Sequence, residues 1–212
     1  IPILLSVWAM SYIERLFKKV MPDTLSTVFT PFFTMLVTVP VSLCALAPLG
    51  SWLGNGLAAF FEMFGSTGGV VAILGAGLLS AAWLPMVISG MHVAVIMIAI
   101  ANFMATGVDS FILPATTLSL WAAYGVEVAS WFKLRNKDEK ALCLGYVIAN
   151  MVGGVGEPFI YGVMLRYRRT FAMAIAGAFV AGAVGMSLGV SVYVAGAASN
   201  VLNLLAFVGG DV

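Results

Sequence analysis

Residues able to do chemistry are few in this sequence, and two of them stand inside long uncharged stretches. Glu157 lies between glycines and a proline in Gly153-Gly154-Val155-Gly156-Glu157-Pro158, and His92, the one histidine of the chain, follows Ser89-Gly90-Met91. A carboxylate accepts several hydrogen bonds, and a neutral imidazole donates one and accepts one. Together they suit a ligand that is rich in hydroxyl groups.

The composition is that of a membrane protein. Hydrophobic residues make up 62% of the 212 residues and charged residues only 9%, against about 25% in an ordinary soluble domain. The mean hydropathy is +1.07. A formal net charge of +1 offers no basic surface for nucleic acid. Cys44 and Cys143 are too few for a disulfide scaffold, and the sequence has no metal-ligand spacing or nucleotide-binding loop, so we expect no metal or other cofactor.

Each candidate residue also has a purely structural interpretation. Glu157 could merely cap a helix that begins at Pro158, a role compatible with ligand binding, and His92 could be bound to a neighbouring carbonyl. Asn150 could hold the turn beside Glu157. Trp83 could stack on a ring-shaped ligand, although we favour a role as an anchor at the membrane surface.

Charged residues divide the chain into segments. All ten lysines and arginines fall in clusters at 15–19, 133–140 and 166–169, which the positive-inside rule places on the cytoplasmic side. The runs between the charges are long enough for spanning helices of about 20 apolar residues. The expected elements are an interfacial amphipathic helix at 8–20 (or a cytoplasmic extension of a spanning helix), an outward crossing at 25–49 kinked by prolines, an amphipathic surface segment at 51–64, an inward crossing at 68–85, a broken stretch at 83–91, and apolar runs at 96–103 and 113–131.

Residues 141–165 carry the strongest topological signal. Cationic clusters flank the segment at both ends, so both ends belong on the cytoplasmic side. Two arms of about 12 residues would each extend about 18 Å, roughly half the bilayer core. The central glycines permit a tight turn, and Pro158 is favoured in the first turn of a new helix. We therefore predict a re-entrant hairpin whose tip carries Glu157 near the membrane midplane, where an ionisable group is a functional candidate.

These motifs resemble those of a known family. The segment from Gly156 to Val163, followed by Leu165-Arg166, resembles the signature G-I-T-E-P-x-[IL]-Y-G-V-x-L-[RK] of enzyme IIC permeases in the glucose superfamily of the bacterial sugar phosphotransferase system. Ser89-Gly90-Met91-His92 resembles the G-[LM]-H motif of the β-glucoside, sucrose and trehalose branch. The segment from Trp8 to Arg15 is similar to the family's amphipathic helix. Val155-Gly156 departs from the signature, where the family usually has Ile-Thr.

The resemblance implies a permease that works as a homodimer in the bacterial cytoplasmic (inner) membrane. Residues 1–64 would end an N-terminal scaffold half, and residues 65–212 would belong to the sugar-binding transport half, both within a longer chain. The resemblance implies that His92 and Glu157 bind sugar hydroxyls. We also predict substrate-binding roles for Asn150 and Gly156, and a catalytic role for Glu157. Phosphate would come from a cysteine of a separate cytoplasmic IIB domain, so neither cysteine of this chain is given that task.

The sequence thus predicts an all-α integral membrane protein, a multi-span helical bundle with re-entrant hairpins and an interfacial amphipathic helix. Its expected function is to bind a glucoside or disaccharide and to present it to IIB for phosphorylation during uptake. An ion-coupled secondary sugar transporter is the alternative, and the scarcity of further buried carboxylates counts against it. A purely structural membrane subunit would not need a charged group at a hairpin tip.

Overall fold

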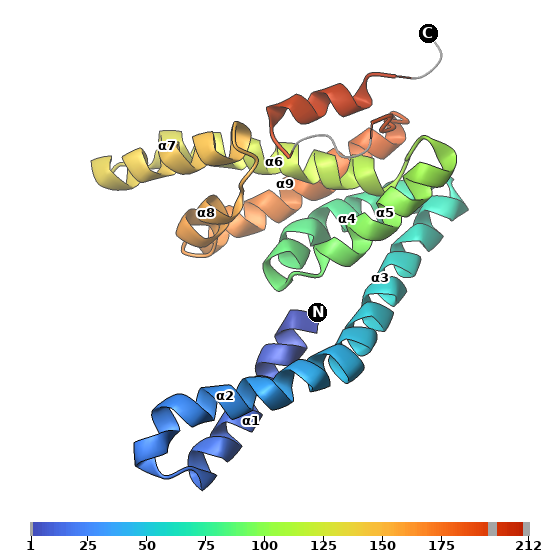
Figure 1. Ribbon diagram of the computed structural model, residues 1–212. Coiled ribbons are helices and arrows are strands. Elements are labelled where there is room, and N and C mark those ends of the chain that lie inside the picture. The colour runs from blue at the N-terminus through green and yellow to red at the C-terminus, as the bar shows by residue number, and fades with distance from the viewer. Residues whose placement is uncertain (1, 195–198, 210–212) are drawn as a thin grey trace.

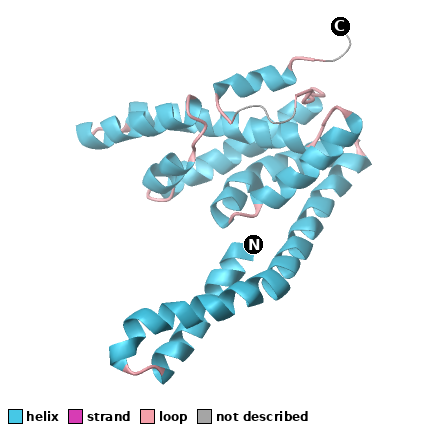
Figure 2. Cartoon of the chain, viewed as in Figure 1, coloured by secondary structure: helices cyan, strands magenta, loops and turns pink. Residues whose placement is uncertain are grey.

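The computed structural model of the chain describes residues 2–194 and 199–209, and most of them lie in helices (Figure 2). The predicted all-α class is confirmed for this part of the chain. The elements in order are α1 (Pro2–Val20), α2 (Asp23–Val41), the π-helical turn η1 (Ser42–Leu46), α3 (Ala47–Thr67), α4 (Gly69–Ser89), α5 (His92–Thr106), α6 (Ile112–Lys133), α7 (Lys137–Met151), α8 (Glu157–Phe159), the π-helical turn η2 (Ile160–Met164), α9 (Arg168–Ser187) and the 3-10 helix η3 (Val201–Phe207).

Four helical runs in the described residues are long and apolar enough to cross a membrane. They are Leu25–Thr67, Gly69–Ser89, Ile112–Lys133 and Arg168–Ser187. Large apolar side chains also stay exposed along these helices, as expected for surfaces that face lipid or other protein. The predicted membrane class therefore agrees with the lengths and the exposed faces of the helices.

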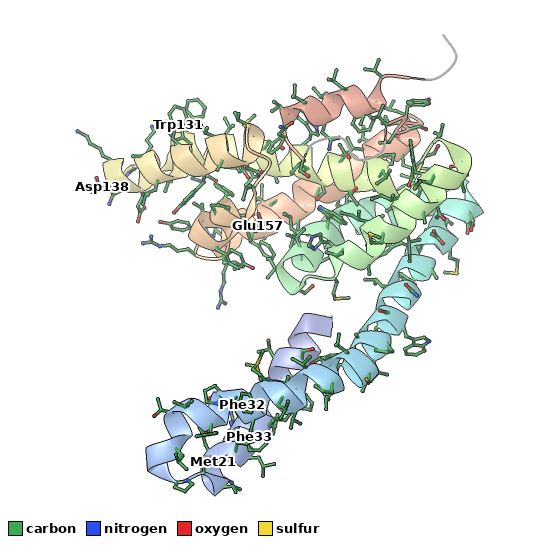
Figure 3. All side chains as sticks on the ribbon, viewed as in Figure 1. Met21, Phe32, Phe33, Trp131, Asp138 and Glu157 are labelled. Carbon is green, nitrogen blue, oxygen red and sulfur yellow. The ribbon has the colours of Figure 1, made fainter. Side chains whose placement is uncertain are left out.

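The N-terminal arm consists of α1 and α2, which pack against each other and extend away from the other helices (Figure 1). The rings of Phe17 and Phe33 stack at 5.8 Å between centroids. Figure 3 shows Phe33 in this arm, with Met21 close to the turn between the two helices. As predicted, the first helix ends just before Met21-Pro22. Its placement at the membrane interface stays a prediction.

The long helical run after Pro22 corrects two sequence predictions. The outward crossing at 25–49 and the surface segment at 51–64 are not separate elements, because α2, η1 and α3 form one run of 43 residues from Leu25 to Thr67. The π-helical turn lies just before Pro48 and widens the helix there, with the Ala47 amide bonded to the Ser42 carbonyl. At 1.5 Å per residue the run is about 65 Å long, about twice the bilayer core.

The core of the bundle is formed by α4, α6 and α9, which pack closely through small residues. Gly182 of α9 lies directly against Ser80 and the Ala76 carbonyl of α4. Ser80 Oγ in turn donates a 2.7 Å hydrogen bond to the Ala115 carbonyl of α6. Small residues at helix interfaces let backbones approach closely, and here they bring three helices together behind the hairpin.

The break between α4 and α5 is narrower than the predicted stretch at 83–91. The α4 helix continues through Pro85 to Ser89, and only Gly90 and Met91 interrupt it. Gly90 adopts a left-handed conformation (φ +72°), which ends the helix without the steric strain that a side chain would bring. The chain then turns back along α5, with His92 as its first residue (Figure 1).

The segment around 141–165 folds back on itself as the charge pattern predicts. The arms are unequal, however: α7 has 15 residues, whereas the return arm consists of the 3 residues of α8 and the 5 of η2. The difference arises because Asn136 caps α7 inside the basic cluster, with Oδ1 accepting a 2.9 Å hydrogen bond from the Asp138 amide. The outgoing arm therefore begins earlier than residue 141.

The two ends of this hairpin meet. Glu139 near the start of α7 forms a 3.0 Å ion pair with Arg166 and accepts a 3.1 Å hydrogen bond from the Tyr167 hydroxyl, both just after the return arm. Figure 3 shows Trp131 and Asp138 near this end and Glu157 away from it on the return arm. The hairpin therefore leaves and returns at one end of the bundle.

The tip of the hairpin lies beside the middle of α6. The Tyr124 hydroxyl of α6 donates a 2.9 Å hydrogen bond to the Ser199 carbonyl. Gly154 in the turn packs against that same Ser199, so closely that a Cβ would lie 3.3 Å from the Ser199 backbone. If α6 crosses the bilayer, this contact puts the tip near the midplane.

Replacing Gly182 by alanine is expected to destabilise the bundle by about 1–3 kcal/mol, because the new Cβ would overlap Ser80 Oγ and lie 2.6 Å from the Ala76 carbonyl oxygen. Gly177→Ala on the same helix is the control, since its Cβ would meet only Ala122 Cβ at 3.9 Å. Thermal unfolding of the purified protein in detergent measures both. Equal melting temperatures for the two variants would contradict the close packing of α4 on α9.

Cysteines placed at the exposed positions Lys137 and Arg168 are expected to react with an impermeant thiol reagent from the same, cytoplasmic, side of intact cells or inverted vesicles. A cysteine at Val108, in the turn between α5 and α6, serves as the control and should react from the opposite side. Labelling of Lys137→Cys and Arg168→Cys from opposite sides would show that the hairpin crosses the membrane.

Candidate functional site

A cavity of about 390 Å³ lies where the two helix breaks face each other. It is bounded by the end of α4, by α5 and α6, by the hairpin tip and by residues at 192–194 and 199–206. Its volume is within the range of about 300–1,000 Å³ that is usual for small-molecule sites. The four candidate residues from the sequence, His92, Asn150, Gly156 and Glu157, all line it. The structure therefore brings them together from two breaks that lie far apart in the chain.

Glu157 is the first residue of α8, with Gly156 in the N-cap position before it. The residue is exposed, and it lines the cavity. The alternative that Glu157 is the cap of a helix starting at Pro158 does not match this geometry, because the helix already includes Glu157. Its carboxylate is instead at the opening of the turn, where it can accept hydrogen bonds from a ligand.

His92 is half-buried, and its ring is oriented by Trp83. The two rings pack edge to face, with centroids 5.7 Å apart and planes at 83°. The Nδ1 atom is buried and has no hydrogen-bond partner among the described residues, so the alternative of a bond from Nδ1 to a neighbouring carbonyl is not found there. Trp83 itself lines the cavity, which corrects the preferred interpretation of this residue as a membrane-surface anchor.

Asn150 is buried, with 2% of its surface exposed, and it pairs with a residue that the sequence analysis overlooked. Its Nδ2 donates a 2.5 Å hydrogen bond to Oε1 of Glu127 in α6. Glu127 is 1% exposed and also lines the cavity. Glu127 is thus a buried carboxylate at the site that the sequence analysis did not name as a candidate, although such groups remain few in the described part of the chain, as expected. The signal was present, because Glu127 is an ionisable residue inside the apolar run at 113–131.

The segment after α9 supplies a wall of the cavity that the sequence analysis did not foresee. Ser199 and Asn203 line the cavity next to the hairpin tip. Asn200 fixes this segment to the hairpin, because its Nδ2 donates a 3.1 Å hydrogen bond to the Val152 carbonyl. No spacing or charge pattern in the sequence points to these residues, and only the folded chain brings them to the tip.

The lining of the cavity is polar on one part and apolar on another. Glu157 and His92 offer hydrogen-bonding groups, whereas Ile96, Ile100, Leu113 and Leu120 offer apolar surface. Such a lining suits a small, uncharged molecule with several hydroxyl groups and apolar faces. Within the described residues no group of three His, Cys, Asp or Glu side chains could hold a metal ion.

Comparison with known proteins gives the family. The model of the family "Phosphotransferase system, EIIC" matches residues 1–178. The chain is 34% identical over 209 residues to the PTS system beta-glucoside-specific EIIBCA component of Bacillus subtilis, a match that covers 99% of the chain and 34% of that protein. The corresponding component of Halalkalibacterium halodurans is 33% identical and is matched over 87% of the chain and 28% of that protein.

A sucrose-specific EIIBC component from Klebsiella pneumoniae is 31% identical, with 86% of the chain and 39% of that protein matched. The chain therefore spans between about a quarter and two fifths of the length of these relatives. No solved structure matched the chain significantly. None of these comparisons supports the ion-coupled alternative. On the strength of the match over residues 1–178, this chain belongs to the EIIC family of the phosphotransferase system.

Proposed function

We propose that this chain binds a sugar in the cavity between the two helix breaks and presents it to a cytoplasmic IIB component for phosphorylation during uptake. The observation that supports this most strongly is the convergence of His92 and Glu157 on one cavity. The relatives named above are specific for beta-glucosides or sucrose and contain a B component. A glucoside or a disaccharide is therefore the proposed substrate, and a IIB domain the proposed partner.

The proposal includes the division of the chain into a scaffold part at 1–64 and a transport part at 65–212, in a homodimeric permease of the bacterial inner membrane. The separation of α1 and α2 from the helices that surround the cavity supports a distinct N-terminal part (Figure 1), whereas α3 packs against α4 and α5. Val28, Phe32 and Leu36 expose apolar surface along α2. This surface would suit contact with lipid or with other parts of the permease.

The chemistry proposed for Glu157 follows from its position at the hairpin tip. Its carboxylate accepts hydrogen bonds from sugar hydroxyls, and His92 provides a second hydrogen-bonding group on the other wall. When the sugar hydroxyl attacks the phosphorus atom of a phosphorylated IIB, the O–P bond forms and the bond to the IIB carrier breaks. Glu157 orients that hydroxyl and takes up its proton, and the charged ester is poorly accommodated by the largely apolar lining of the cavity.

Glu157→Gln in the full-length permease is expected to weaken equilibrium binding of a β-glucoside such as salicin, or of sucrose, by roughly 10- to 100-fold. This is the loss expected when a hydrogen bond to a charged group is removed. Glu14→Gln is the control, because Glu14 lies on α1 in an exposed ion pair with Lys18. Binding by scintillation proximity in detergent measures both. Unchanged affinity in Glu157→Gln would contradict the role of this carboxylate.

Uptake in membrane vesicles tests the reaction itself. With a phosphoenolpyruvate-driven phosphoryl chain and IIB supplied, the sugar is expected to accumulate as its phosphate ester, which chemical analysis of the vesicle contents detects. Without the phosphoryl chain, accumulation should be lost. Accumulation of unmodified sugar in response to a proton or sodium gradient would instead identify an ion-coupled transporter.

A further inference from the structure

Glu127 has no part in the mechanism above, yet it is one of the most completely buried polar side chains in the described part of the chain. It lies on α6, an element that does not belong to either helix break. Its hydrogen-bond partner is Asn150, which lies at the end of the outgoing arm of the hairpin. This contact therefore joins the fixed bundle to the hairpin that carries Glu157.

Asn150 contacts the middle and the end of the 152–156 turn that follows it. Its backbone carbonyl accepts a 2.9 Å hydrogen bond from the Gly154 amide. Its side-chain amide lies against Gly156, where an added Cβ would be 3.2 Å from Nδ2 and 3.3 Å from Oδ1. Gly156 directly precedes Glu157. A rotation or shift of the Asn150 side chain would therefore move the residue that sets the direction of Glu157.

The pair has little freedom to rearrange. Both side chains are almost fully buried, and Glu127 Oε2 and Asn150 Oδ1 have no partner among the described residues. Losing the remaining hydrogen bond would leave further buried polar groups unpaired, which is unfavourable in apolar surroundings. The Asn150 amide is therefore held in one orientation by Glu127, and the 152–156 turn packs against it.

We propose that Glu127 is a positioning residue of the sugar site. It fixes Asn150, and through Asn150 it fixes the 152–156 turn in the conformation that directs Glu157 into the cavity. The proposal rests on the proposed function, since it assigns a role within the same site. It requires only a hydrogen-bond acceptor at position 127, whereas direct binding of sugar by the Glu127 carboxylate would require its charge.

Sugar binding by three variants of the full-length permease separates these requirements. Glu127→Gln keeps an acceptor for Asn150 and is expected to bind salicin or sucrose within about threefold of the wild type. Glu127→Leu removes the acceptor at similar size and is expected to lose about tenfold in affinity. Asn150→Ala should cause a comparable loss, and the double variant Glu127→Leu/Asn150→Ala should be no weaker than either single variant.

A second readout needs no sugar. The other cysteines of the permease are first replaced, and a cysteine is then introduced at Val155, which is exposed in the turn. The rate at which this cysteine reacts with a thiol reagent reports the conformation of the turn. The rate is expected to change at least threefold in Glu127→Leu and Asn150→Ala and to stay unchanged in Glu127→Gln. Ser130→Ala is the matched control on α6, because Ser130 Oγ bonds only within its own helix, to the Val126 carbonyl.

Two results would overturn the proposal. One is an equal loss of affinity in Glu127→Gln and Glu127→Leu, which would assign the carboxylate a direct role. The other is an unchanged rate at Val155→Cys in both Glu127→Leu and Asn150→Ala. If Glu127→Leu does not fold, Asn150→Ala removes the same hydrogen bond from the other side. If the wild type binds no sugar, the proposed function fails, while the thiol measurement still decides whether Glu127 holds the turn.

Discussion

If the hairpin enters the bilayer as proposed, the polar groups of its non-helical turn at 152–156 must be satisfied by protein, and the candidate site depends on how they are satisfied. Three contacts hold it. Glu127 binds the Asn150 side chain from α6, Asn200 binds the Val152 carbonyl, and Gly154 packs on Ser199, which Tyr124 fixes in turn. These partners come from α6 on one side of the turn and from residues 199–200 on the other. They hold the turn beside the middle of α6, and with it they hold Glu157 at the cavity.

The second break serves the same cavity by simpler means. A left-handed glycine, Gly90, ends α4, and the chain reverses at once, so that His92 opens α5 with Trp83 beside it. Close packing of α4 against α6 and α9 fixes where this reversal lies relative to the hairpin. The two breaks together bring His92 and Glu157 to the lining of one cavity that also offers apolar surface, an arrangement typical of specific small-molecule sites.

The parts of this arrangement that local chemistry determines were predictable from the sequence. Glycines beside Glu157 predict a turn, flanking cations predict that the hairpin ends meet, and Glu139 and Arg166 do form an ion pair there. The prediction of separate elements at 25–49 and 51–64 is wrong, because one helical run continues through the π-helical turn and past Pro48. Two features could not be predicted from local patterns, because they depend on how distant segments of the chain pack. They are the pairing of Glu127 with Asn150 and the cavity wall formed by Ser199 and Asn203.

The central claim is that the hairpin tip and the α4–α5 break bind one sugar between them. A structure of the full-length permease in lipid nanodiscs with a bound β-glucoside or sucrose tests this most directly. The account predicts density for a sugar ring in the cavity, with hydroxyl groups within hydrogen-bond distance of the Glu157 carboxylate and the His92 ring. A sugar bound elsewhere in the permease, with Glu157 and His92 both free of it, would contradict the account.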